Sequence, residues 1–112
     1  MSDYRTLDAV EEDYFRQRPE EIGPYLTEIF AEFAMDGDAA ALLNSLRVIT
    51  RVKGISAVAE ETGLTRQGLQ KALSVKGNPR FENINAIMHA LGYRLVPQKL
   101  EMTEAVMVNS PL

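Results

Sequence analysis

The polar residues with the clearest chemical use lie close together in the second half of the chain. Thr65, Arg66 and Gln67 stand at the start of a predicted helix, and Gln70 and Lys71 share its exposed side. A guanidinium can bond a guanine edge or bind a phosphate, and a Gln amide can both donate to and accept from an adenine edge. Such side chains at a helix start are typical of the element that enters the major groove of DNA. The alternative is that each is a solvated surface residue.

Further basic and polar residues flank this cluster. Lys53 precedes it, and Lys76, Asn78 and Arg80 follow in a predicted loop. Residues at the two ends of a DNA-reading helix commonly contact phosphates and so fix the register of the protein on the duplex. The sequence therefore predicts one DNA-binding surface made of base-reading and phosphate-binding side chains.

Residues 55–73 predict the helix-turn-helix that would position these side chains. Ala59 provides a small residue where the two helices cross, and Gly63 lies four residues later in the turn. Leu69 is spaced to lock the second helix against the first, and Thr65 is suited to cap its start. Plain helical hairpins can show the same spacing, but the basic and polar residues that follow the turn favour DNA binding.

Apolar residues at steps of three and four predict helices on both sides of this motif. They indicate a short helix within residues 4–18, one that opens at Pro19, one from Asp38 to about Val52 and one from about Phe81 to Leu91. The helix after Pro19 is expected to bury a stripe formed by Ile22, Leu26, Ile29, Phe30 and Phe33. Met35 is expected to belong to the core beside these aromatic residues.

Together these elements predict an all-α fold, a compact bundle of about five to six helices in one domain over residues 1–97. Within it, residues 19–52 are leading helices and residues 53–92 the helix-turn-helix region. A short extended segment is expected at residues 93–96, and residues 98–112 are expected to form a flexible tail.

Composition limits the class of protein. With 112 residues, 46% hydrophobic and 25% charged, the chain has the balance of one globular domain. It has no apolar run long enough to span a membrane and no apolar export signal, so we expect a cytoplasmic protein with no membrane partner. The absence of Cys excludes disulfides, thiolate metal sites and cysteine nucleophiles.

The net charge of −4 hides an uneven distribution. Residues 1–44 carry three basic and eleven acidic side chains, a net charge of −8, whereas residues 45–94 carry eight basic and three acidic ones, a net charge of +5. This asymmetry indicates two faces with different partners, of which one is polyanionic. The simpler alternative is an uneven scatter of solvated charges.

Catalysis finds little support in the sequence. His89 is the single His, and no spaced carboxylate pair or Cys accompanies it as a metal ligand. Neighbouring acidic residues such as Glu11 and Glu12 diverge on a helix and cannot converge on one site. No glycine-rich phosphate loop or nucleophile elbow is present. We therefore expect no enzyme activity, no cofactor and no metal.

The helix-turn-helix segment and its surroundings resemble a known family. The similarity is carried by residues 55–69, Leu73, residues 77–79 and residues 90–95, and the leading helices match through residues 19–22, Tyr25, Leu26, Gly37 and Asp38. These segments are similar to the addiction-module antidote proteins, HigA-like bacterial antitoxins with a lambda-repressor-like DNA-binding domain of the Xre/Cro type. The resemblance covers most of the chain.

The resemblance implies an antitoxin that binds and neutralises a small toxin of the RelE/ParE class. It also implies that a homodimer of the antitoxin represses its own operon at an inverted-repeat operator, with two recognition helices about 34 Å apart, one turn of DNA. The acidic first half would suit a basic toxin, and the basic second half would suit an operator. A stand-alone Xre-type regulator and a protein-interaction module that does not bind DNA are the alternatives.

Overall fold

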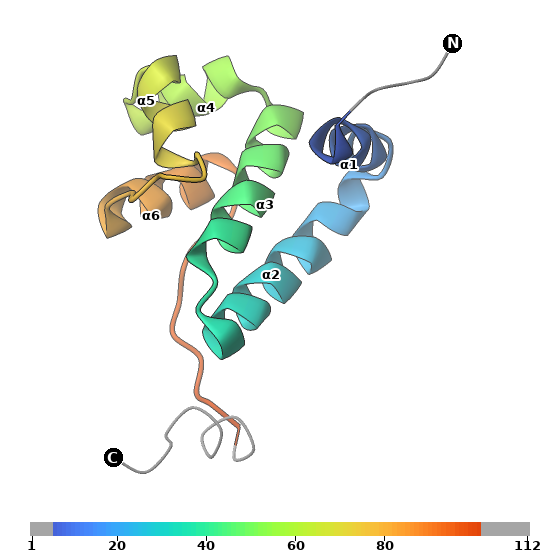
Figure 1. Cartoon of the computed structure of the whole chain (residues 1–112), viewed down its shortest axis with the longest axis vertical. Helices are drawn as coiled ribbons and strands as arrows, with labels where there is room; N and C mark the ends of the chain where they lie inside the picture. The colour runs from blue at the N-terminus through green and yellow to red at the C-terminus, as the bar shows by residue number, and fades with distance from the viewer. Residues whose placement is uncertain (1–5, 102–112) are drawn as a thin grey trace.

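The structure is a computed structural model that describes residues 6–101. Every regular element within this range is helical (Figure 1). The elements are α1 (Leu7–Gln17), the short 3-10 helix η1 (Pro19–Glu21), α2 (Ile22–Asp36), α3 (Ala39–Lys53), α4 (Ile55–Thr62), α5 (Arg66–Ala72) and α6 (Phe81–Ala90). The predicted all-α bundle is therefore confirmed, with six α-helices in the described part of the chain.

Local sequence signals set the helix ends. The Thr6 hydroxyl accepts a hydrogen bond from the Ala9 N–H and so caps α1. Asp38 caps α3 in the same way by accepting from the Ala41 N–H at 3.0 Å. Gly37 ends α2 in the left-handed conformation, with φ of 68°, which costs a glycine little because it has no Cβ. The predicted boundary between α2 and α3 is therefore correct.

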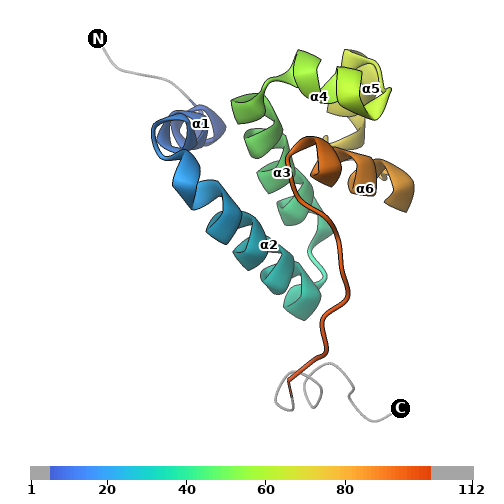
Figure 2. The ribbon, with the colours of Figure 1, turned by 180° about the vertical axis from the view of Figure 1, so that it is seen from behind.

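The central element is α3. Figure 1 shows α2 running back alongside α3, with α1 across one end of this pair and α4, α5 and α6 on the other side of α3. Contacts join α1 and α2 to α3, α3 to α4, and α4 to both α5 and α6. Figure 2, seen from the opposite side, shows the segment after α6 passing down in front of α3 towards the end of α2 and the start of α3.

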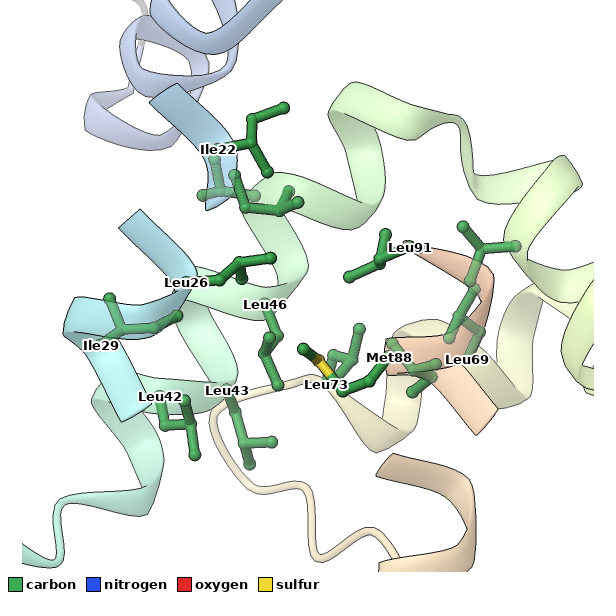
Figure 3. Packing of buried hydrophobic residues seen from close by; sticks show 14 of the residues in the cluster. Ile22, Leu26, Ile29, Leu42, Leu43, Leu46, Leu69, Leu73, Met88 and Leu91 are labelled. Atoms are coloured by element: carbon green, nitrogen blue, oxygen red, sulfur yellow. The ribbon is translucent and has the colours of Figure 1, made fainter. Parts of the chain in front are cut away.

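Side chains of α3 form the middle of the hydrophobic core. Leu46, Val48 and Ile49 are completely buried there. The core continues on one side into α2 and on the other into the last three helices, as Figure 3 shows. These flanking residues are Ile22, Leu26, Ile29, Leu69, Leu73, Ile87, Met88 and Leu91. One core therefore runs through the helices before and after α3.

One detail of the predicted core is wrong. Phe33 is 36% exposed and Met35 is 45% exposed, although both were expected in the core. All residues from 31 to 41 are exposed, so the end of α2, the turn at Gly37 and the start of α3 are left uncovered by the rest of the described chain. Residues 93–96, for which an extended segment was predicted, belong to no helix or paired strand, and Leu95 packs against the core. Of the predicted tail, residues 98–101 are exposed and irregular, and the remainder lies outside the described residues.

Candidate nucleic-acid interface

The turn between α4 and α5 has the geometry that its sequence predicts. Gly63 adopts φ of 77°, and its N–H donates to the Ala59 carbonyl at 3.0 Å. The Thr62 hydroxyl donates to the same carbonyl and accepts from the Leu64 N–H, which fixes the chain as it leaves α4. Ala59 is 5% exposed and Leu69 is completely buried, so both predicted structural residues belong to the hydrophobic core.

Thr65 caps the start of α5. Its backbone is extended, and its hydroxyl accepts a hydrogen bond from the Gly68 N–H at 2.9 Å. A Cβ added at Gly68 would lie 3.0 Å from this hydroxyl oxygen, which is a tight contact. The glycine within a helix, which costs about 1 kcal/mol relative to Ala, therefore leaves room for the cap.

The predicted base-reading residues all lie on α5 with exposed side chains. Arg66 and Gln67 open the helix, and Gln70 and Lys71 follow one turn later. None of these four side chains has a hydrogen bond or ion pair with another described residue. Their donors and acceptors are therefore available to an external partner.

The predicted phosphate-binding residues divide into two groups. Lys76, Asn78 and Arg80 are exposed in the loop from α5 to α6, next to the end of the α5 helix. Arg80 lies 3.6 Å from Glu82, but both side chains are more than 70% exposed, so solvent screens this pair. Lys53 is exposed at the end of α3, and Figure 1 shows α4 between that end and α5. The structure therefore does not place Lys53 with the cluster on α5.

The loop after α5 is packed tightly against the helix it follows. The Gly77 N–H donates to the Ser74 carbonyl at 2.8 Å, and the Ser74 hydroxyl donates to the Lys71 carbonyl. A Cβ built at Gly77 would lie only 2.2 Å from the Ala72 carbonyl oxygen. Close approach of two backbone segments thus requires a glycine here, and it positions the loop that carries Lys76 and Asn78.

Arg47 is a residue near the site that sequence reasoning missed. It lies on α3 and donates to the Leu73 carbonyl, at the end of α5, at 2.5 Å. The same guanidinium contacts Asp8 on α1 at 3.5 Å, and Arg51 contacts Glu12 on α1 at 3.3 Å. The sequence showed only the charge of Arg47, because Asp8 and Leu73, its partners, lie far from it along the chain. Two cations of the basic segment are thus paired with α1.

The acidic side of the molecule has three groups with displaced pKa values. Burial, with a smaller effect from Asp8, raises the pKa of Glu11. A hydrogen bond to Glu21 raises the pKa of Tyr14, whose hydroxyl lies 2.5 Å from that carboxylate. Burial raises the pKa of Tyr25, which hydrogen-bonds Ser45. The three residues with displaced pKa values therefore stand on α1 and α2, and none of them stands on α5.

Within residues 6–101, no three His, Asp or Glu side chains are grouped as metal ligands would be. His89 is exposed on α6. No helix in the same range has the length and apolar character needed to cross a membrane.

Comparisons with known proteins identify similar chains. Residues 5–99 match the family model described as "Probable addiction module antidote protein". An uncharacterized protein of Haemophilus influenzae is 38% identical over 80 residues, which cover 71% of this chain and 78% of that protein. No solved structure matches the chain with significance.

Proposed function

Because the chain belongs to the family of probable addiction module antidote proteins, we propose that it is the antitoxin of a type II toxin-antitoxin system that also represses its own operon. In this role it binds operator DNA as a homodimer through α5 and neutralises a toxin of the RelE/ParE class by direct contact. We propose a binding role in the cytoplasm, without catalysis, cofactor or metal.

The observation that carries DNA binding is the exposed start of α5. Arg66 and Gln67 have no hydrogen-bond or ion-pair partner among the described residues. Thr65 caps the start of the helix on which they stand. A guanidinium and an amide in adjacent positions can bond the edges of neighbouring base pairs. The firmly held loop with Lys76 and Asn78 supplies donors for phosphates at the other end of the helix.

The charge distribution supports a second partner on the other side of the molecule. Exposed carboxylates lie along α2 and the turn after it, at Glu28, Glu32, Asp36 and Asp38. DNA repels such a surface, whereas a basic protein is attracted to it. The proposed toxin and the proposed operator therefore approach different faces of the antitoxin.

The proposal is tested by titrating the purified protein against its own upstream DNA and a shuffled control at two salt concentrations. We expect tighter binding to the upstream DNA and a steep loss of affinity as salt rises, because phosphate contacts release counterions. Equal affinity for both DNAs would contradict sequence-specific repression. Affinity that does not depend on salt would favour a protein-interaction module instead.

The toxin half of the proposal has its own test. The neighbouring reading frame is co-expressed with a tagged form of this chain, and the tagged protein is purified. A stable complex that suppresses the toxicity of the neighbour is expected. DNA binding without any such complex would favour the stand-alone regulator of the Xre type.

A further inference from the structure

Arg47 connects α1 to α5 through a single guanidinium. It stands on α3 with a side chain that is 14% exposed, and it donates to the Leu73 carbonyl at 2.5 Å and to the Asn44 side chain. Its Nη2 lies 3.5 Å from the Asp8 carboxylate on α1. We propose that Arg47 is a positioning residue for α5 and that Asp8 holds it in place, so that docking of α1 controls how firmly the DNA-binding helix is held.

The end of α5 needs such support. The helix has seven residues, of which Leu69 is the buried one, and Leu73 is its C-terminal cap. A helix this short is marginal without tertiary contacts, and its last carbonyls have no partners within the helix. A cation at this end satisfies one carbonyl and interacts favourably with the negative end of the helix dipole. Arg47 provides both effects from a neighbouring helix.

Polar contacts hold α1 on α3. Phe15 is the buried residue of α1, whereas Asp8 and Glu12 reach across to Arg47 and Arg51. The Asn44 amide also donates to Asp8, at 3.4 Å. The attachment of α1 therefore combines the buried Phe15 with charge pairs at Asp8 and Glu12, and a competing cation can disrupt these pairs.

This inference rests on the proposed function and links its two halves. A basic partner that draws Asp8 and Glu12 away from α3 would leave Arg47 without its carboxylate. The guanidinium would then be free to leave the Leu73 carbonyl, and α5 would fray at its C-terminal end. Binding of a cationic protein to α1 would thus weaken binding of DNA to α5 without any contact between the two surfaces.

The test compares Asp8→Ala with Glu12→Ala. Both substitutions remove one negative charge from α1 and contacts to α3, so the change in long-range attraction to DNA is shared. Asp8 contacts Arg47, Asn44 and, at 3.9 Å, Arg51, whereas Glu12 pairs with Arg51 and Arg16 and does not contact Arg47. Amide hydrogen exchange of α5 is measured first on each purified full chain, without DNA. Binding to the upstream DNA is measured second.

We expect Asp8→Ala to speed exchange at the end of α5 by about three- to tenfold and to weaken DNA binding by a similar factor, the size expected for loss of one ordinary hydrogen bond. Glu12→Ala should leave α5 exchange at the wild-type rate. Arg47→Met should match or exceed Asp8→Ala, and Arg47→Lys should restore part of the protection. Exchange in α4 should not change in any of them.

Equal α5 exchange in wild type, Asp8→Ala and Arg47→Met would overturn the inference. Equal acceleration in Asp8→Ala and Glu12→Ala would also overturn it, because α1 would then act through general stability and not through Arg47. If α5 responds as expected but the wild type does not prefer its upstream DNA, the positioning role stands and the proposed function fails. The exchange measurement therefore tests the positioning role of Arg47, and the binding measurement tests the proposed function separately.

Discussion

Replacing Thr50 by Val should stabilise the protein. Thr50 is completely buried on α3, and its hydroxyl oxygen has no hydrogen-bond partner. A buried polar group without a partner costs about 1 to 3 kcal/mol, and Val keeps the branched shape of Thr while removing the hydroxyl. We therefore expect the free energy of unfolding to rise by about 1 to 2 kcal/mol. In a domain of this size that is a rise of about 4 to 12 °C in Tm.

The matched control is Val48→Thr, which places a hydroxyl at another completely buried position of the same helix. It should lower the free energy of unfolding by about 1 to 3 kcal/mol. Both values come from thermal and urea unfolding followed by circular dichroism. A lower stability of Thr50→Val than of wild type would refute the reasoning, because it would mean that the Thr50 hydroxyl forms a stabilising hydrogen bond in solution.

Three other predictions concern stability. Leu69→Ala, at the buried centre of α5, should lower the free energy of unfolding by about 2 to 5 kcal/mol in a urea melt and abolish DNA binding through this loss of stability. A urea melt near that of wild type would show that α5 packs differently. Gly77→Ala should cost about 1 to 3 kcal/mol because its Cβ would meet the Ala72 carbonyl oxygen at 2.2 Å, and an unchanged Tm would show that the loop can move away. The raised pKa values of Tyr14 and Tyr25 mean that the folded state holds phenol protons that the unfolded chain releases above its ordinary pKa of 10.0. Stability should therefore be full below that pH and fall as pH rises through the raised values, and Tyr25→Phe should lessen this loss in melts between about pH 8 and 11.

Local signals in the sequence predicted the helix boundaries well. Asp38 and Thr65 cap α3 and α5, and Gly37 and Gly63 end α2 and α4, because each of these effects depends on neighbours within a few residues. Burial of Leu69 followed from its spacing in the same way. Information of this kind is present in any short window of the chain.

Features that depend on distant residues could not be predicted. The periodicity of α2 shows which side is apolar but not that its last turn is left uncovered, so Phe33 was expected in the core although it is exposed. Charge counting placed Arg47 and Arg51 in the basic segment but could not show that both pair with carboxylates of α1. The contact of Arg47 with α5 joins residues that are 26 positions apart, and no local pattern marks it.

The central claim is that α5 reads a specific DNA sequence, and a comparison of two arginine variants tests it most directly. Arg66→Ala and Arg94→Ala each remove one exposed positive charge, but only Arg66 stands on the proposed reading face of α5. Affinity for the upstream DNA and for a shuffled control is measured at one salt concentration by fluorescence anisotropy. We predict that Arg66→Ala loses about tenfold or more of its preference for the upstream DNA, whereas Arg94→Ala keeps the wild-type preference. Equal preference in wild type, Arg66→Ala and Arg94→Ala would contradict the assignment of α5 as the reading helix.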